Sequence, residues 1–200
     1  IDGTARFVDD HTVVVDTAEG EKLFKADRIF INTGATPFVP PVEGLTIGGA
    51  IHTSETIMNL EEYPESLVII GSGFIGLEFA ATYAQFGTKV TVVDVIDTFL
   101  PREDEDVAQA VKEQLEALGV TFNLGVQLKA VHQEGGKAVV EATTGEGAPV
   151  AFTADAVLVA TGRRANVQGL DLDKAGVELT ERGAIKVNEF LQTNVPHIFA

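Results

Sequence analysis

The sequence predicts an α/β protein built around a parallel sheet, and three observations support this class. Two short apolar runs, 67–70 and 156–160, lack polar alternation, as is typical of parallel strands covered on both faces. The first run leads into a glycine-rich turn and then into a helical pattern over 77–86. A further strand at 89–93 follows that helix at the spacing of a β–α–β unit. We therefore expect a parallel sheet with helices on both faces.

The N-terminal part is expected to contribute strands and then a connection. A β-branched run at 12–15 and an apolar run at 28–32 predict two of these strands. Three prolines between positions 37 and 41 favour an extended connection over 35–50, because proline fixes φ and removes a backbone donor.

The chain after position 100 predicts a second helix and then a meander. Pro101 precedes this helix, and the acidic run 103–106 places negative charge at its positive end. Gly119 is expected to end it. The segment 120–153 alternates apolar and polar residues between glycine turns, which indicates a small antiparallel meander. The apolar stripe expected on the helix consists of Val107, Val111, Leu115 and Leu118.

Two segments, 26–34 and 154–162, share one sequence frame. Each begins with Ala-Asp, continues as an apolar run and closes with Thr-Gly, six and seven residues after the Asp. The pattern predicts a buried strand that ends in a tight turn at both places. This shared frame fits two alternatives. The segments are either two unrelated buried strands, or parts of two related structural units, in each of which the chain returns to the unit's own sheet through the same kind of strand and turn.

Composition and charge narrow the classes of partner. The chain has a hydrophobic fraction of 45% and a formal charge of −16, the balance of a soluble globular protein with an acidic surface. Nucleic acid and anionic membrane surfaces are therefore not expected as partners. No apolar run reaches the length of a membrane span and the first residues do not resemble a signal peptide, so a cytoplasmic protein is expected. A small-molecule dinucleotide stays compatible, since backbone amides can hold one anionic ligand locally.

The chain contains no cysteine, which excludes disulfide scaffolds, thiolate metal sites and cysteine nucleophiles within these residues. Its four histidines, His11, His52, His132 and His197, are scattered along the sequence. Their spacing does not predict that two of them share one metal ion, so no metal site is expected.

The main functional signal is the turn GSGFIG, formed by Gly71, Ser72, Gly73, Phe74, Ile75 and Gly76. A strand precedes this turn and a helix opens on it, which is the setting of a Rossmann-like dinucleotide-binding site. Gly71 is expected to permit the tight turn, Gly73 to let a pyrophosphate approach the backbone, and Gly76 to let the helix pack against the strand. The unpaired amides and the dipole of the helix start then bind phosphate charge.

Two acidic residues extend this predicted site. Asp94 ends the second strand eighteen residues after Gly76, where it can accept hydrogen bonds from the adenine-ribose hydroxyls and repel a 2′-phosphate. No arginine occupies positions 95–101, which favours NAD(H) over NADP(H). Glu78 is expected in the first helical turn, either as a capping charge or as an acceptor for a nicotinamide carboxamide.

Together with the run VATGRRAN (159–166), these features resemble the pyridine nucleotide–disulfide oxidoreductases along the whole chain. That family includes dihydrolipoamide dehydrogenase, glutathione reductase and mercuric reductase. The runs FLPRED (99–104) and ERGAI (181–185) are most similar to its mercuric-reductase-like branch, which includes flavoproteins of the reactive-chlorine-resistance type. The resemblance implies a homodimer in which an FAD domain is interrupted by an NAD(P) domain and followed by a dimerisation domain.

The resemblance also implies a division of this chain. Residues 1–50 correspond to a partial FAD-domain segment and linker, with FAD-domain strands. Residues 51–184 correspond to the NAD(H)-binding domain, and residues 185–200 to the start of the returning FAD-domain segment.

Cofactor contacts are implied residue by residue. Glu78 matches the family's nicotinamide-side glutamate, and Asp94 matches its acidic ribose ligand. Phe74 stands where many members carry a gate over the nicotinamide face of the flavin. The remaining implied contacts are Leu128 and Gly162 to NAD, and Ala5, Thr33, Gly34 and Ala35 to FAD, with Arg163 on the flavin side.

The implied activity is that of an enzyme that passes hydride from NADH to FAD and on to a disulfide, a dihydrolipoamide-type acceptor or a metal ion. Family catalysis uses a cysteine pair and a histidine–glutamate dyad that have no match in this chain. No catalytic residue is therefore expected here, and the chain by itself is expected to bind dinucleotide without turnover. Two alternatives stay open: an NADH oxidase or peroxidase-type flavoenzyme with one cysteine, and a non-catalytic NADH-responsive redox sensor.

Overall fold

A computed structural model describes residues 1–200, which form two compact units. Unit 1 comprises residues 1–36 and 163–200, and unit 2 comprises residues 37–162. These boundaries differ from the divisions expected after residues 50 and 184. Residues 163–184 belong to unit 1 because they complete its small core, where Leu172 and Val177 pack with Phe7 and Ile198.

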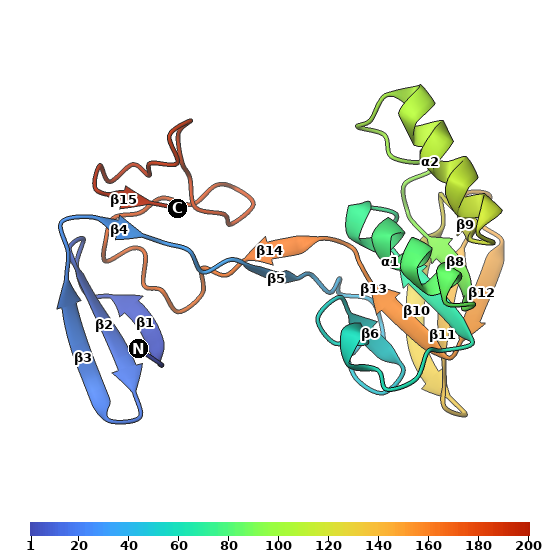
Figure 1. Cartoon of the computed structure of the whole chain (residues 1–200), viewed down its shortest axis with the longest axis horizontal. Helices are drawn as coiled ribbons and strands as arrows, with labels where there is room; N and C mark the ends of the chain where they lie inside the picture. Colours follow the sequence, from blue (N-terminus) through green and yellow to red (C-terminus); the bar gives the residue numbers. More distant parts are fainter. The chain divides into compact units, whose positions relative to one another are not determined.

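Unit 2 is built on a five-stranded parallel sheet with the strand order β6-β13-β7-β8-β9 (Figure 1). Every neighbouring pair in this sheet is parallel, as the sequence predicts. The strands are β6 (Ile51–Thr53), β7 (Ser66–Ile70), β8 (Lys89–Val93), β9 (Thr121–Asn123) and β13 (Ala156–Val159). Before β7 lies a short 3-10 helix, η1 (Ile57–Asn59).

The two faces of this sheet are covered by different kinds of structure. Successive residues of a strand point to opposite faces, so Leu67 and Ile69 of β7 pack against the helices α1 (Phe74–Gln85) and α2 (Glu105–Ala117). Val68 and Ile70 instead pack against the antiparallel sheet of β10 (Gln127–Glu134), β11 (Lys137–Thr143) and β12 (Pro149–Ala154). The expectation of helices on both faces is therefore wrong, because the meander covers the second face.

The meander itself confirms the prediction of an antiparallel sheet. Strands β10, β11 and β12 pair in sequence order, and the two glycine turns predicted between them join neighbouring strands. The first residues of the segment 120–153 do not belong to the meander, because β9 pairs in parallel with β8 and extends the main sheet.

Helix α2 buries a slightly different stripe from the one expected. Ala108 and Leu115 are buried, whereas Val107 is 49% exposed and Leu118 is 43% exposed. Leu115 is buried and Val111 packs against the same core as predicted, so the observed stripe differs from the expected one only at its two ends. Helix α1 begins at Phe74, three residues earlier than predicted.

Unit 1 contains three small sheets. Its strands are β1 (Thr4–Phe7), β2 (Thr12–Thr17), β3 (Gly20–Lys25), β4 (Ile29–Phe30), β5 (Ala35–Pro37), β14 (Arg163–Ala165) and β15 (Ile198–Phe199). The first three form an antiparallel sheet, while β4 pairs with β15 and β5 pairs with β14 (Figure 1). The expected buried strand at 28–32 is wrong in its burial, because β4 is two residues long and Phe30 is 71% exposed.

Two of the four histidines, which are scattered along the sequence, lie together in the structure. The rings of His11 and His197 stack with a centroid separation of 3.9 Å and an interplanar angle of 2°. His11 lies just before β2 and His197 just before β15, so the fold of unit 1 brings together residues from its two separate chain segments.

No helix in the structure has the length and apolar character needed to cross a membrane.

Candidate dinucleotide-binding site

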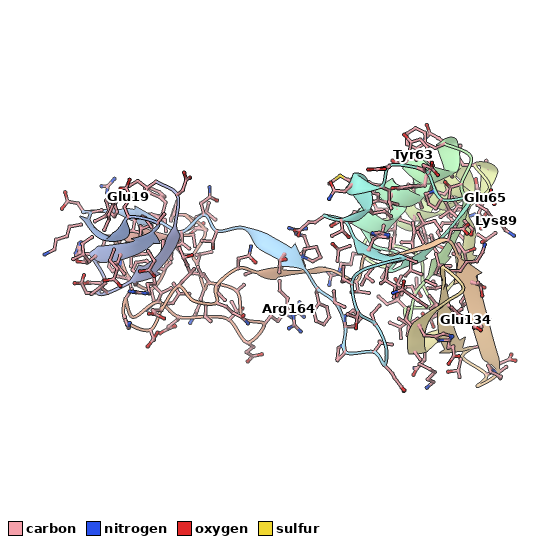
Figure 2. All side chains as sticks on the ribbon, turned by 90° about the horizontal axis from the view of Figure 1, so that it is seen from below. Glu19, Tyr63, Glu65, Lys89, Glu134 and Arg164 are labelled. Carbon is pink, nitrogen blue, oxygen red and sulfur yellow. The ribbon has the colours of Figure 1, made fainter.

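The glycine-rich turn lies at the carboxyl end of β7, in the middle of the parallel sheet. The chain passes from β7 through α1 to β8 on one side, while β13 pairs with β7 on the other. In open α/β sheets, ligands bind at such a reversal of connection outside the carboxyl ends of the strands. At the opposite end of the sheet, where β7 and β8 begin, the amide of Lys89 donates to the carbonyl of Glu65 over 2.9 Å. Figure 2 labels both residues.

Backbone hydrogen bonds fix the turn between its neighbouring strands. The amide of Gly71 donates to the carbonyl of Val93 in β8 over 2.9 Å. On the other side, the amide of Ala160 donates to the carbonyl of Ile70 over 2.8 Å. The turn is therefore held in position from both sides before any ligand binds.

The three glycines of the turn have different surroundings. Gly71 has a φ of 111°, and a Cβ atom there would press against the carbonyl of Ala160. A Cβ atom on Gly76 would overlap the carbonyl oxygen of Gly71. Gly73 has an ordinary φ of −75°, and a Cβ atom there would meet no protein atom within 4 Å. The protein's own packing thus requires glycine at 71 and 76, but it does not require glycine at 73.

Helix α1 presents unpaired amides beside Gly73. Gly73 is the N-cap residue and no side chain caps the helix; the amide of Leu77 donates to the carbonyl of Gly73 over 3.0 Å. The preceding amides of the first turn have no intrahelical acceptor, and the helix dipole adds positive potential there. The first turn holds no acidic residue. The expected place of Glu78 in that turn is therefore wrong: it lies in the second turn and is exposed.

Asp94 connects the glycine-rich turn to the end of β8. Its Oδ2 accepts hydrogen bonds from the amide of Ser72 over 2.6 Å and from the Ser72 hydroxyl over 2.7 Å. Its Oδ1 accepts from the amide of Ile96 over 3.0 Å. A carboxylate offers about four lone-pair directions, so Asp94 retains acceptor capacity for a ligand hydroxyl. The structure therefore gives this residue a positioning role that the sequence pattern did not indicate.

A cavity of about 290 Å³ opens beside the turn and Asp94. It is lined by Ser72, Gly73, Phe74, Asp94, Ile96, Leu100, Pro101, Arg102 and Glu103. The mixture of an apolar wall with a few polar groups is typical of sites that bind small molecules and cofactors.

Several of these lining residues were missed in the sequence interpretation. Ile96, Leu100 and Pro101 form the apolar wall, a role that the sequence pattern does not indicate. Arg102 lies one position beyond that stretch and also lines the cavity. A guanidinium there weakens the argument that no basic residue is available for a 2′-phosphate. In the sequence, Arg102 directly follows the stretch 95–101 that lacks arginine.

The remaining predicted contacts of unit 2 lie outside this cavity lining. The turn and the start of α1 contain Gly71, Ile75 and Gly76. These residues do not line the cavity but support the backbone of the residues that do. Gly162 follows β13 with a φ of 124°, and its carbonyl accepts from the amide of Phe38 over 2.9 Å. Leu128 lies on β10, where it packs against the hydrophobic core beneath the meander.

The predicted flavin-side residues lie in unit 1. Ala5 and Thr33 line a second cavity of about 190 Å³. The Thr33 hydroxyl donates to the carbonyl of Asn166 over 2.7 Å, and the amide of Asn166 donates to the carbonyl of Gly34 over 3.0 Å. The guanidinium of Arg163 donates to the carbonyl of Ala35. The structure thus brings the segments 33–35 and 163–166 together, although the sequence does not predict this pairing.

The most strongly shifted carboxylate is far from the glycine turn, at the amino end of β13. Hydrogen bonds from Lys137 and Ser66 lower the pKa of Asp155 from its ordinary value of 3.8 to about 2. The Ser66 hydroxyl donates to Oδ2 of Asp155 over 2.5 Å, and Nζ of Lys137 lies 2.8 Å from Oδ1. These contacts join β13 to β7 and to the meander, so the role of Asp155 is structural.

Comparisons with known proteins agree with this geometry. The chain is 38% identical to the RclA pyridine nucleotide-disulfide oxidoreductase of Escherichia coli K12, with 100% of this chain and 44% of that protein covered. It is 37% identical to dihydrolipoyl dehydrogenase of Bacillus subtilis 168, over 100% of this chain and 43% of the relative. The chain therefore spans less than half the length of these curated relatives.

Solved structures and a family model give the same result. The Cu(II) complex of the HOCl-induced flavoprotein disulfide reductase RclA from Escherichia coli superimposes with a TM-score of 0.92. Sequence identity in that match is 36%, covering 100% of this chain and 44% of the other. The model of the family described as "Pyridine nucleotide-disulphide oxidoreductase" matches residues 1–200. The chain therefore belongs to the pyridine nucleotide–disulphide oxidoreductase family.

Proposed function

We propose that unit 2 binds NAD(H) at the glycine-rich turn. The observation that carries this proposal is the open space at Gly73, beside the unpaired amides of α1. Because neither backbone strain nor internal packing requires glycine there, the missing Cβ leaves room for a ligand that must approach the backbone closely. The residues present therefore fit a dinucleotide pyrophosphate.

Each part of the dinucleotide has a matching group. The first amides of α1 bind the pyrophosphate, and the remaining acceptor capacity of Asp94 binds a ribose hydroxyl. Ile96, Leu100 and Pro101 cover the adenine. Phe74, which is 64% exposed at the helix start, would serve as the gate over the nicotinamide face of the flavin, and the exposed Glu78 would accept a hydrogen bond from the carboxamide. When bound, the nicotinamide ring supplies or accepts the hydride.

In the whole protein, we infer that this site passes hydride from NADH to FAD and that the electrons continue to a disulfide, a dihydrolipoamide-type substrate or a metal ion. Family membership supports this inference, as do the relatives described as a flavoprotein disulfide reductase and a dihydrolipoyl dehydrogenase. Unit 1 then supplies part of the flavin site through the segments around Ala5 and Thr33. Gly34, Ala35 and Arg163 hold those segments together.

Cofactor preference tests the assignment of Asp94. We expect NADH to bind at least about tenfold more tightly than NADPH, equivalent to about 1.4 kcal/mol, because the carboxylate repels a 2′-phosphate. Calorimetric titration of the chain with both dinucleotides measures this ratio. Equal or reversed affinities would refute the ribose assignment.

Two variants separate the groups that set this preference. Asp94→Asn should reduce the preference for NADH over NADPH, because it weakens the binding of NADH and removes the repulsion of the 2′-phosphate of NADPH. Arg102→Ala should weaken NADPH binding more than NADH binding, because only NADPH carries the extra phosphate. If Arg102→Ala affects both dinucleotides equally, the guanidinium does not face the 2′-position.

A further inference from the structure

Asp94 is held in place through its backbone as well as its side chain. Its amide donates to the carbonyl of Asn123 over 3.1 Å, and its carbonyl accepts from the amide of Val126 over 2.9 Å. These two bonds fix the backbone directly after the end of β8. The orientation of the carboxylate then depends on the groups that donate to its two oxygens.

The two oxygens of this carboxylate differ in the donors that they already have. Oδ2 accepts from both the amide and the hydroxyl of Ser72, at 2.6 Å and 2.7 Å. Oδ1 accepts one bond, from the amide of Ile96 at 3.0 Å. Each oxygen of a carboxylate offers about two lone-pair directions. The protein therefore uses both directions of Oδ2 and leaves one direction of Oδ1 for a ligand.

The Ser72 hydroxyl keeps Oδ2 occupied. Ser72 is only 6% exposed, so water has little access to its bond with Asp94. A hydroxyl has one hydrogen, and that of Ser72 is donated to Oδ2. Because the amide and the hydroxyl of one residue donate to the same oxygen, rotation of the carboxylate would break two bonds at once. This arrangement keeps Oδ1 as the oxygen that can accept from a ligand.

The other charged groups that line the cavity do not offer an equally fixed acceptor. The guanidinium of Arg102 donates hydrogen bonds and accepts none. Glu103 carries a carboxylate, but the residue is exposed, so a hydrogen bond to that carboxylate competes with water. Oδ1 of Asp94 is therefore the best-ordered side-chain acceptor for a sugar hydroxyl in this cavity.

We propose that Ser72 is a positioning residue that sets specificity, because its hydroxyl restricts Asp94 to one hydrogen bond from the adenine ribose. The inference rests on the proposed function, in which Asp94 faces the 2′-position of that ribose. Asp94 then accepts from the 2′-hydroxyl alone, through Oδ1, and the 3′-hydroxyl is left to water. Without the Ser72 hydroxyl, each oxygen of Asp94 would have a free direction, and the carboxylate could accept from both neighbouring hydroxyls.

Adenosine diphosphates that lack one hydroxyl test this proposal. ADP, 2′-deoxy-ADP and 3′-deoxy-ADP are titrated against the 200-residue chain by calorimetry, and competition with NADH shows that they occupy the dinucleotide site. We expect 2′-deoxy-ADP to bind at least about fivefold more weakly than ADP, because it lacks the hydroxyl that donates to Oδ1. The affinity of 3′-deoxy-ADP should stay within about twofold of that of ADP, because its missing hydroxyl has no partner on Asp94.

The variant Ser72→Ala removes the hydroxyl but keeps the amide that donates to Asp94. The affinities of the two deoxy analogues should then differ by less than about twofold, since Oδ2 becomes available to the 3′-hydroxyl. A role of Ser72 in stability alone would not change this ratio. The matched control is Thr98→Ala, which removes a hydroxyl that donates to Asp97 over 3.0 Å but does not line the cavity. This control should keep the ratio of the unmodified chain.

The outcomes separate this inference from the proposed function. If neither NADH nor ADP binds, both are wrong. If NADH binds but the unmodified chain does not distinguish the two deoxy analogues, or if Ser72→Ala keeps their ratio, the proposed role of Ser72 alone is overturned. Thermal melting shows whether Ser72→Ala folds. Ser72→Cys, which keeps the shape of the side chain with only a weak donor, is the second variant and should lower the ratio in the same direction.

Discussion

The segments 26–34 and 154–162 share a sequence frame but have different environments. Phe30 and Leu158 occupy equivalent positions, three residues after the Asp of each frame. Leu158 is completely buried, whereas Phe30 is 71% exposed. The same pattern of Asp, apolar run and Thr-Gly therefore produces a central strand in unit 2 and a short surface strand in unit 1.

Neighbouring structure accounts for this difference. Strand β13 pairs with β6 on one side and β7 on the other, and both of its faces are covered. Strand β4 pairs only with the two-residue strand β15. Apolar composition thus predicts that a segment is a strand, but the number of neighbouring strands and layers decides whether its side chains are buried.

The largest expected contrast comes from truncating the equivalent side chains. Leu158→Ala should lower the free energy of unfolding of unit 2 by about 2–5 kcal/mol, because it leaves a cavity at a fully buried position. Phe30→Ala should change the stability of the chain by less than about 0.5 kcal/mol. Urea denaturation measures both effects. A large loss for Phe30→Ala would show that β4 contributes to a core in solution.

A smaller contrast is expected between the aspartates that open the two frames. Asp155→Asn should lower stability by about 1–2 kcal/mol at pH 7, since its hydrogen bonds with Ser66 and Lys137 tie β13 to its neighbours. Asp27→Asn, at an exposed position, is the matched control and should have almost no effect.

The contribution of Asp155 should also depend on pH in a defined direction. Its pKa in the folded chain is about 2, below the ordinary 3.8, so its contribution is complete above about pH 4. It is then lost as the pH falls from about 4 toward 2. The stability difference between the unmodified chain and Asp155→Asn should shrink over that window. A difference that grows on acidification would contradict the assigned pKa shift.

The smallest contrast concerns the threonines that close the frames. The Thr161 hydroxyl donates to the carbonyl of Phe38 over 2.8 Å at a partly buried position, so Thr161→Val should cost about 1 kcal/mol. Thr33 makes an equivalent bond to Asn166, but it is exposed, and Thr33→Val should cost less than about 0.5 kcal/mol. Thermal melts of both variants rank the two bonds. The reverse order would indicate that solvent exposure does not weaken the Thr33 bond.

The sequence predicts the parallel sheet of unit 2 well, because its signals are local. Apolar runs without alternation mark β7 and β13, and the glycine-rich turn marks the start of α1. The covering of the second face by the meander is not predictable in this way, since it depends on packing between distant strands. The observed boundary between the units at residue 163 is not predictable from local signals either, because residues 163–184 pack with the N-terminal strands through long-range contacts.

The candidate site shows the same division between local and long-range information. The packing around Gly71 and Gly76 leaves no room for a Cβ atom, as expected from the fingerprint spacing, whereas the binding role of Gly73 stays a prediction. The bond between Ser72 and Asp94 and the pairing of His11 with His197 join residues far apart in sequence, and no local pattern indicates them.

The most direct test of dinucleotide binding uses Gly73→Val, with Gly145→Val as a control at another glycine of ordinary φ. Because Gly73 has no protein atom within 4 Å of its missing Cβ, the variant should melt within a few degrees of the unmodified chain. Its NADH affinity should fall by at least about 2 kcal/mol, or some thirtyfold, because valine occupies the space of the pyrophosphate. Gly145→Val should leave NADH affinity unchanged. Retained stability together with unchanged NADH affinity in Gly73→Val would contradict the proposed binding of the pyrophosphate at this turn.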